Sequence, residues 1–313
     1  MSTASELKIY DVIIIGGGPA GYSAALYASR AGYEAVVVER LSAGGQMALT
    51  GDIDNYPGFE EGIDGFTLGM KMQQSAERFG AVTKYAEIRS VDFSGEVKKL
   101  YTQKEELLAR NVIIASGANP REVGVDGEAD YIGRGIHYCA HCDGRFYKDK
   151  TVAVIGGGNS AAADALYLSK LVKKVYLVHR RDTLRAEKIY ADKLFEAENV
   201  EFLWDNKVES LEAGERVNAI NLVNLKNGEK RNLQIDGVFV SIGRRPATEF
   251  LGGALSLDGN GYIIAGEDTK TNIDGVFAIG DVRTKPVRQI VTATADGAVC
   301  VHFAEEYIGN CGF

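Results

Sequence analysis

The sequence has few cysteines and prolines and no excess of positive charge. It contains four cysteines and five prolines in 313 residues, and its 35 lysines and arginines are outnumbered by 43 aspartates and glutamates. So few cysteines exclude a disulfide-stabilised scaffold. The net charge of −8 argues against a protein whose partner is nucleic acid or an anionic membrane. The first ten residues include Glu6 and Lys8 and no apolar core, so we expect no secretory signal and a cytoplasmic location.

The longest uncharged run, Val12–Ser29, is barely long enough to cross a bilayer as a helix. Four glycines and a proline interrupt it between Gly16 and Gly21, where a membrane-spanning helix would be weakened. A buried strand, a glycine turn and a helix explain the run better. Glycine is abundant, at 37 residues, which favours tight turns and close approach of the backbone to ligands. The chain length predicts two domains.

The first fifty residues have the pattern of a β-α-β unit. A short apolar strand is expected at Asp11–Ile15, a helix at Tyr22–Arg30, and a second strand at Ala35–Val38 that ends at Glu39. Between the first strand and the helix, the G-x-G-x-x-G pattern is met by Gly16, Gly18 and Gly21. Such a turn admits a pyrophosphate, which the N-terminus of the helix then binds. The strand, the glycines and the acid together predict a dinucleotide site.

The same pattern recurs near the middle of the chain. A strand at Thr151–Ile155 is followed by the turn Gly156–Ala161, a helix at Ala162–Leu171 and a strand at Lys174–Val178. Ala161 takes the place of the third glycine, which is a common variant of the pattern. The chain therefore contains a second predicted dinucleotide site.

The two units differ in charge where their second strands end. Glu39 follows Gly16 at the same spacing at which His179 follows Gly156, so the two residues occupy equivalent positions. His179 is followed by Arg180 and Arg181, with Arg185 further on. A carboxylate accepts hydrogen bonds from a ribose diol, whereas guanidinium groups bind a 2′-phosphate. The first site therefore suits FAD and the second NADPH rather than NADH, unless the arginines are only a solvated basic face.

The remaining strands predict an α/β protein with two Rossmann-like domains. Strands that end in glycine are expected at Asn111–Ser116, before Gly117, and at Ile235–Ile242. A strand and turn at Gly275–Asp281 precede a final helix from about Gln289 to Tyr307. Because such elements return after residue 270, the second domain is predicted to be inserted in the first. The expected parts are residues 1–118 (FAD), 119–246 (NADPH, with the cysteine pair) and 247–313 (FAD).

Two cysteines form a C-x-x-C motif ahead of the second nucleotide unit. Cys139 and Cys142 are within disulfide reach and read as a redox pair, and Asp143 could take and return the proton that thiol chemistry requires. A zinc site with His137 or His141 would need further ligands, and a purely structural disulfide is the other alternative. Cys300 is predicted to be a buried inert thiol, and Cys311 an unpaired thiol of the tail, with a relay role as the alternative.

These motifs, in this order, resemble the low-molecular-weight thioredoxin reductases over nearly the whole chain. The matching segments are Gly16–Gly21, Gly44–Gln46, Asn55–Gly58, Cys139–Gly144, Gly156–Ala161, His179–Arg181 with Arg185, Gly280–Asp281 and Arg288–Gln289. The resemblance implies a homodimeric enzyme that uses FAD and NADPH to reduce thioredoxin, with a nucleotide domain that rotates between two states. Within the cysteine pair, it implies that Cys142 faces the flavin and that Cys139 is more exposed.

By the same resemblance, Glu39 binds the adenosine ribose, Gln46 and Asn55 line the flavin, Asp281 holds the ribityl chain, and Arg288 and Gln289 lie by the isoalloxazine. The further residues expected at the FAD site are Gly16, Gly18, Pro19, Ala20, Gly21, Arg40, Gly45, Gly117 and Gly280. Those expected at the NADPH site are Gly156, Gly158, Asn159, Ser160, Ala161, His179, Arg180, Arg181 and Arg185.

Two residues depart from the family pattern. His141 stands where a small or hydroxyl residue is common, and Ala293 where some relatives have a hydroxyl. They leave open another acceptor in place of thioredoxin: a glutaredoxin-like protein, a protein of a peroxiredoxin system, or oxygen. A different class of function, a non-catalytic NADPH sensor with a zinc-bound cysteine pair, predicts a metal in the purified protein and no electron flow to disulfides. A metal assay and the yellow colour of flavin distinguish it from the enzyme.

Overall fold

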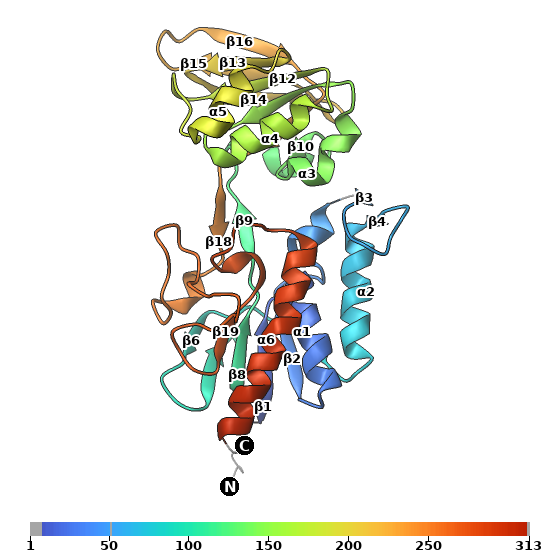
Figure 1. Ribbon diagram of the computed structural model, residues 1–313, viewed down its shortest axis with the longest axis vertical. Coiled ribbons are helices and arrows are strands. Elements are labelled where there is room, and N and C mark those ends of the chain that lie inside the picture. Colours follow the sequence, from blue (N-terminus) through green and yellow to red (C-terminus); the bar gives the residue numbers. More distant parts are fainter. Residues whose placement is uncertain (1–7, 51, 312–313) are drawn as a thin grey trace. The chain divides into compact units, whose positions relative to one another are not determined.

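The chain folds into two compact units, which are described separately below (Figure 1). The structure is a computed structural model that describes residues 8–50 and 52–311, without the side chains of Asp52 and Cys311. Unit 1 is built from the residues up to Asn119 and from Arg245 onward, and unit 2 is Pro120–Arg244. Two strands that pair with each other, β9 (Ala118–Pro120) and β18 (Arg244–Pro246), lie where the chain passes between the units.

Unit 1 has a seven-stranded sheet in the order β5-β2-β1-β8-β7-β6, with β19 also paired to β8. The mutually parallel strands are β5 (Val82–Tyr85), β2 (Ala35–Glu39), β1 (Ile9–Ile15), β8 (Glu106–Ile114) and β19 (Val276–Ala278). Strand β7 (Lys98–Tyr101) is antiparallel to β8, and β6 (Ser90–Asp92) is antiparallel to β7. A separate hairpin pairs β3 (Asp52–Ile53) with β4 (Ile63–Asp64).

Both faces of this sheet are covered, which explains why the buried part of β1, Val12–Ile15, is entirely apolar. Val12 and Ile14 pack into one core with the helices, while Ile13 and Ile15 pack into a second core on the other face. The helices are α1 (Pro19–Arg30), α2 (Gly65–Glu77) and α6 (Ile290–Cys311). Figure 1 shows α1 and α6 side by side over the sheet, and an added Cβ at Gly297 would lie 2.6 Å from the carbonyl oxygen of Ala20. Glycine at this position therefore allows α1 and α6 to cross closely.

Unit 2 has a five-stranded parallel sheet in the order β10-β17-β11-β12-β13. Its strands are β10 (Ile136–His137), β17 (Gly237–Val240), β11 (Thr151–Ile155), β12 (Lys174–His179) and β13 (Val200–Trp204). A three-stranded antiparallel sheet is formed by β14 (Asn206–Ala213), β15 (Val217–Asn224) and β16 (Lys230–Gln234). The helices are α3 (Ala140–Asp143), α4 (Asn159–Ser169) and α5 (Lys188–Phe195).

The fold class expected from the sequence is confirmed, while several element ends differ by a few residues. Helix α1 begins at Pro19 rather than Tyr22, because proline suits the first position of a helix, where its missing N–H leaves no hydrogen bond unmade. Strand β8 ends at Ile114 rather than Ser116, just before Gly117 turns the chain with a φ of +71°. Helix α6 continues past Tyr307 to Cys311.

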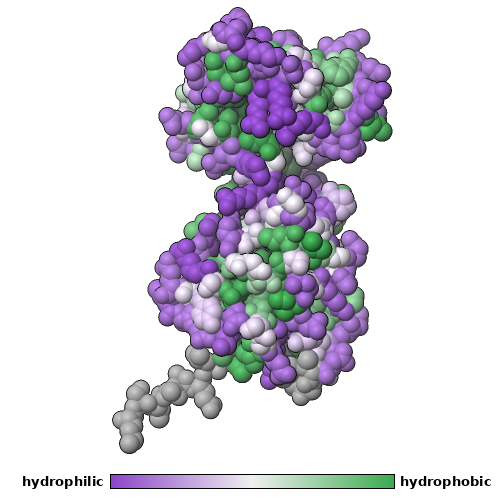
Figure 2. Space-filling model, turned by 90° about the vertical axis from the view of Figure 1, so that its left-hand side faces the viewer, coloured by the Kyte–Doolittle hydropathy of each residue, from purple (hydrophilic) through white to green (hydrophobic). Residues whose placement is uncertain are grey.

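Hydrophilic residues cover much of the face of each unit that Figure 2 presents, with smaller groups of hydrophobic residues between them. No helix in the described part of the chain is long and apolar enough to cross a membrane.

Candidate nucleotide and dithiol sites

The first glycine turn, between β1 and α1, can be formed only by glycine at two positions. Gly16 has a φ of +107°, and an added Cβ would lie 2.4 Å from the carbonyl oxygen of Ala115. A Cβ on Gly21 would lie 1.9 Å from the carbonyl oxygen of Gly16. Gly18 is the N-cap of α1, has no side-chain cap, and has no atom within 4 Å of an added Cβ. The N–H groups of this helix end are therefore open to an anion such as a pyrophosphate.

Glu39, at the end of β2, is already bonded to the backbone of the turn. Its Oε2 accepts a hydrogen bond from the N–H of Gly17 at 2.7 Å, and its Oε1 accepts one from the N–H of Leu41 at 2.8 Å. An ionised carboxylate can accept about four hydrogen bonds, so Glu39 can still accept two from a ribose diol. The neighbouring Arg40 is exposed and lies 3.9 Å from Glu87.

Other residues expected at the flavin come together in unit 1 from distant parts of the sequence. Gln46, in the short helix η1 (Gly45–Leu49), donates a hydrogen bond to Asn119 at 3.0 Å. Asn55 donates one to Gln289 at 3.2 Å. Both bonds join amide side chains, which can equally bond the carbonyl and N–H groups of a flavin ring. Sequence reasoning did not identify Asn119.

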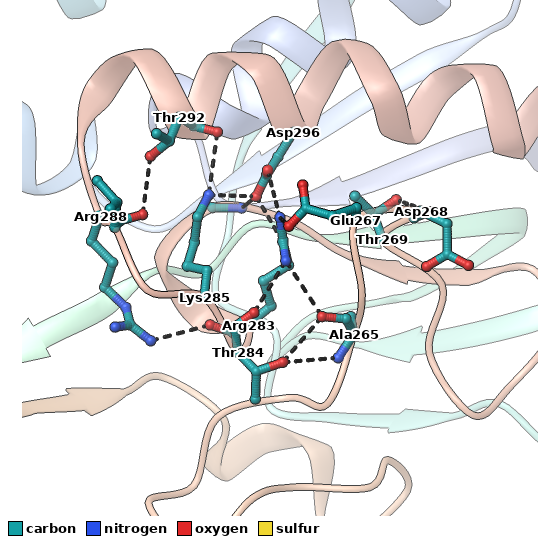
Figure 3. Close-up of polar contacts among 12 residues, drawn as sticks. Ala265, Glu267, Asp268, Thr269, Arg283, Thr284, Lys285, Arg288, Thr292 and Asp296 are labelled. Atoms are coloured by element: carbon teal, nitrogen blue, oxygen red, sulfur yellow. Dashed lines mark hydrogen bonds and ion pairs between the residues drawn. The ribbon is translucent and has the colours of Figure 1, made fainter.

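Gly280 and Asp281, in the short helix η5 (Gly280–Val282), adjoin a buried ion cluster (Figure 3). Asp296 of α6 accepts hydrogen bonds from the N–H of Gly280 at 2.8 Å, from Arg283 Nε at 2.9 Å and from Lys285 Nζ at 2.9 Å. Burial raises the pKa of Asp296, but these hydrogen bonds outweigh it, so the pKa lies below its ordinary value. The cluster fixes the turn that carries Asp281, and sequence reasoning missed it.

Arg288 is held near the same turn. Its guanidinium stacks over the ring of Tyr262 at 4.1 Å and donates to the carbonyl oxygens of Asp281 at 3.4 Å and Arg283 at 3.2 Å. Gly280 has a φ of +69°, and an added Cβ there would lie 2.9 Å from Cβ of Ala20 in α1.

The second glycine turn, between β11 and α4, repeats the geometry of the first. Gly156 has a φ of +147°, and an added Cβ would lie 2.4 Å from the carbonyl oxygen of Ser241. Gly158 caps α4 without a side-chain bond and has no atom within 4 Å of an added Cβ. Asn159 bonds reciprocally with Glu187, at 2.8 and 3.0 Å. Of the residues that follow in this turn, Ser160 is exposed and Ala161 is buried.

His179 lies beneath this turn. The ring is 4% exposed, and an added Cβ on Gly157 would lie 2.3 Å from it. Its Nε2 is buried and has no hydrogen-bond partner among the described residues. Burial, followed by the charges of Arg185, Arg181 and Arg180, lowers the pKa of His179, so the ring is neutral at pH 7.

The three arginines after β12, Arg180, Arg181 and Arg185, are exposed, and their side chains form no ion pair with a carboxylate of the described residues. The nearby acids Asp182 and Asp205 bind Lys226 instead, at 2.9 and 3.0 Å. A cluster of free guanidinium groups beside an open helix N-terminus fits a dinucleotide with an additional phosphate.

The cysteine pair lies at the start of α3 in unit 2. Cys139 and Cys142 form a disulfide with a Cα–Cα distance of 5.3 Å, and Sγ of Cys139 accepts a hydrogen bond from the N–H of Cys142 at 3.2 Å. Asp143 follows directly, and its Oδ2 lies 3.0 Å from Nδ1 of His137. In the described part of the chain, no three His, Cys, Asp or Glu side chains are grouped so that they could hold a metal ion.

Cys300 and His141, which the sequence also singles out, differ in exposure. The predicted burial of Cys300 is confirmed, and burial raises the pKa of its thiol to about 12. The side chain of Cys311 lies outside the described residues. His141 is exposed, and its ring centroid is 4.1 Å from that of Tyr167.

Comparison with known proteins identifies the family. Residues 10–297 match the model of the pyridine nucleotide-disulphide oxidoreductase family. A thioredoxin reductase of Listeria innocua is 45% identical over 97% of this chain and 96% of its own length, and one of Bacillus subtilis is 44% identical over the same shares. The crystal structure of thioredoxin reductase from Streptococcus pyogenes is 41% identical, with a TM-score of 0.90 over 96% of this chain and 99% of that chain. The chain therefore belongs to the pyridine nucleotide-disulphide oxidoreductases and, among them, to the thioredoxin reductases.

Proposed function

We propose that the protein is an NADPH-dependent thioredoxin-disulfide reductase that contains FAD. The observation that carries this proposal is the Cys139–Cys142 disulfide, in a chain that has two glycine turns with side chains of opposite charge beside them. A carboxylate bonds to the first turn, and three uncommitted arginines lie beside the second. This difference suits two different nucleotides.

We assign the two cofactors to the two units. Unit 1 would hold FAD, and unit 2, Pro120–Arg244, would hold NADPH. At the FAD site, the open end of α1 would bind the pyrophosphate, Glu39 the ribose diol, and Asp281 with Arg288 the ribityl chain and the ring. At the NADPH site, the open end of α4 would bind the pyrophosphate, and Arg180, Arg181 and Arg185 the 2′-phosphate. Bound FAD would supply the chemistry that links hydride transfer from NADPH to two-electron reduction of a disulfide.

The cysteine pair then transfers these electrons by thiol–disulfide exchange. The thiolate of Cys139 attacks a sulfur of the thioredoxin disulfide, forming a mixed disulfide and releasing one thioredoxin thiol. The thiolate of Cys142 attacks Cys139 in turn, which re-forms the Cys139–Cys142 disulfide and releases the second thioredoxin thiol. Asp143 takes and returns the protons that these steps require.

Replacement of Cys139 or Cys142 by serine tests this path. Each variant should still bleach its flavin when NADPH is added, because no cysteine takes part in that step. Neither variant should oxidise NADPH in the presence of thioredoxin and a chromogenic disulfide. The matched control is Cys300→Ala, which removes a buried cysteine outside the pair and should keep thioredoxin turnover.

Two outcomes would contradict the proposal in different ways. Thioredoxin turnover in a serine variant would show that the electrons do not pass through the pair. A parent protein that is bleached by NADPH but inactive with thioredoxin would keep the cofactors and move the function to another acceptor. We further propose a homodimer in the cytoplasm, which membership in this family supports; the mass of the purified protein in solution tests the dimer.

A further inference from the structure

His137 is a buried histidine beside the cysteine pair whose two ring nitrogens are both engaged. It ends β10, and 6% of it is exposed. Its Nδ1 lies 3.0 Å from Oδ2 of Asp143, and its Nε2 lies 2.7 Å from the hydroxyl of Tyr147. The ring stacks on Phe239, with centroids 5.3 Å apart, and meets the edge of Tyr147. The imidazole is therefore fixed in position and in orientation.

Hydrogen bonds link Arg216, Tyr147, His137 and Asp143 in a chain. Arg216 donates from its guanidinium to the hydroxyl oxygen of Tyr147 at 3.2 Å, and arginine can only donate. Burial raises the pKa of Tyr147 despite this arginine, so the hydroxyl keeps its proton. The Tyr147 hydroxyl and Nε2 of His137 share a hydrogen bond at 2.7 Å. A carboxylate can only accept, so the Nδ1–H of His137 donates to a carboxylate at Asp143.

Tyr147 is itself fixed by its surroundings. An added Cβ on Gly237 of β17 would lie 2.3 Å from its ring, so the ring fills the space that a side chain at that position would occupy. The other charged groups that act on this cluster are Asp236, through its charge on Tyr147, and Lys150, whose amino group lies 5.5 Å from the centroid of the Tyr147 ring. No acid other than Asp143 faces a His137 nitrogen at hydrogen-bond distance in the described part of the chain.

We propose that His137 is a positioning residue for the dithiol chemistry: it orients Asp143 and sets the pH range in which Asp143 exchanges protons with the cysteine pair. The proposal rests on the proposed function. Reduction of the Cys139–Cys142 disulfide to two thiols takes two electrons and two protons. The hydride from NADPH supplies both electrons and one proton, and solvent supplies the second proton. Both protons leave again when the pair reduces its partner. Asp143 exchanges them, and the N–H of His137 stabilises its carboxylate form.

Two substitutions separate the two nitrogens of His137. In His137→Asn, the amide can take the place of Nδ1 and still donate to Asp143. In His137→Gln, the longer side chain places its amide near Nε2, so it keeps the contact with Tyr147 and loses the donor to Asp143. Because both replacements are neutral amides, they differ mainly in which contact they preserve.

The experiment measures two pH profiles for the parent and both variants in a Cys300→Ala, Cys311→Ser background. One profile is kcat for thioredoxin reduction, and the other is the rate at which iodoacetamide alkylates the reduced cysteine pair. Loss of one hydrogen bond to a carboxylate corresponds to about one pH unit. We expect His137→Gln to move the acid limb of both profiles up by about one pH unit, with less than about twofold change in KM for thioredoxin. His137→Asn should stay within a few tenths of the parent.

Two results would overturn the proposal: His137→Gln profiles that overlay those of the parent, and equal shifts in both variants. A His137 ring that only fills space predicts one or the other of these results. If His137→Gln does not retain FAD, Tyr147→Phe replaces it in the test. Tyr147→Phe should then move the acid limbs of both profiles to higher pH by a smaller amount, and profiles that do not move would overturn the proposal. Should the parent fail to reduce thioredoxin, the proposed function fails, while the alkylation profiles still decide the role of His137.

Discussion

Replacement of Asp296 by asparagine removes the buried carboxylate that pairs with two buried cations, and leaves within ion-pair distance of them, among the described residues, only the exposed Glu267, 3.8 Å from Arg283. Arg283 is 2% exposed, the side chain of Lys285 is 5% exposed, and Asp296 is 7% exposed. Besides its bonds to Arg283 Nε, Lys285 and Gly280, Asp296 accepts a second bond from the Arg283 guanidinium at 2.8 Å. Figure 3 shows Arg283 and Lys285, from the segment that follows η5, converging on the carboxylate of Asp296 in α6.

The expected loss follows from the unpaired charges that remain. Breaking a buried ion pair by removing one partner costs about 3–5 kcal/mol, because the other charge stays buried without compensation. Asparagine keeps one acceptor oxygen and the shape of the side chain, so the lost charge dominates the effect. A domain is typically stable by about 5–15 kcal/mol. We therefore expect Asp296→Asn to lose about 3–5 kcal/mol in the free energy of unfolding of unit 1, and to bind FAD more weakly.

Urea unfolding followed by flavin fluorescence and far-UV circular dichroism measures this loss. The single tryptophan, Trp204, belongs to unit 2, so its fluorescence reports on the unit that the substitution leaves unchanged. The matched control is Glu249→Gln, whose ion pair with Arg245 at 2.9 Å is exposed on both sides and is worth less than about 1 kcal/mol. If Asp296→Asn loses no more than Glu249→Gln, the reasoning from buried unpaired charge is refuted.

The same cluster predicts a dependence on pH. The pKa of Asp296 lies below its ordinary value of 3.8 because its hydrogen bonds outweigh burial. A lowered pKa adds stability above the pKa of the unfolded chain, and this stability is lost as the pH falls through the pKa of the folded state. The difference between the parent and Asp296→Asn should therefore be constant near pH 7 and shrink below about pH 4. Urea midpoints measured at several pH values check this; a difference that grows in acid would contradict it.

Three further outcomes are expected. Replacement of Arg180 and Arg181 by alanine should weaken the use of NADPH by about 1.5–3 kcal/mol for each charged hydrogen bond lost, with little change for NADH; steady-state kinetics with both coenzymes decide it, and equal losses would refute the 2′-phosphate site. Gly21→Ala should prevent FAD binding, because the new Cβ would lie 1.9 Å from a carbonyl oxygen of the same turn; a purified variant with a normal flavin spectrum would contradict this. In a Cys311→Ser variant, Cys300 should not react with a thiol reagent at pH 8 until the protein is unfolded, because burial raises the pKa of its thiol to about 12. Rapid reaction of a third thiol, besides those of Cys139 and Cys142, in the reduced native protein would show that Cys300 is accessible.

The sequence predicted the features that depend on neighbouring residues. The strand before Gly16, the open glycine turn and the helix after it follow from one short local pattern, and the same holds for the turn at Gly156. The fold class followed from the repetition of this pattern. Helix starts were placed too late because Pro19 and Asn159, the first residues after the glycine caps, already belong to the helices, whereas the apolar pattern begins a turn further on.

Features that depend on residues far apart in the sequence could not be predicted in this way. The burial of His179 beneath Gly157 depends on the packing of β12 against the turn, although the position of His179 at the end of a strand was evident. The ion pair of Arg283 with Asp296 joins a loop to a helix, and nothing in the spacing of the two residues indicates it. The bond between His137 and Tyr147 likewise depends on how β10 and η3 (Gly144–Tyr147) meet.

Unit 1 is made from both ends of the chain, and this affects how the protein is completed during translation. Strand β19 pairs with β8, and α6 covers α1, so the sheet and its helical layer lack parts until residues 276–311 have left the ribosome. Unit 2 is continuous from Pro120 to Arg244 and can fold while residues 245–313 are still being synthesised, which takes several seconds at about 5–20 residues per second. During that interval the apolar surface of α1 is uncovered. A nascent chain arrested before α6 is therefore a natural substrate for chaperones.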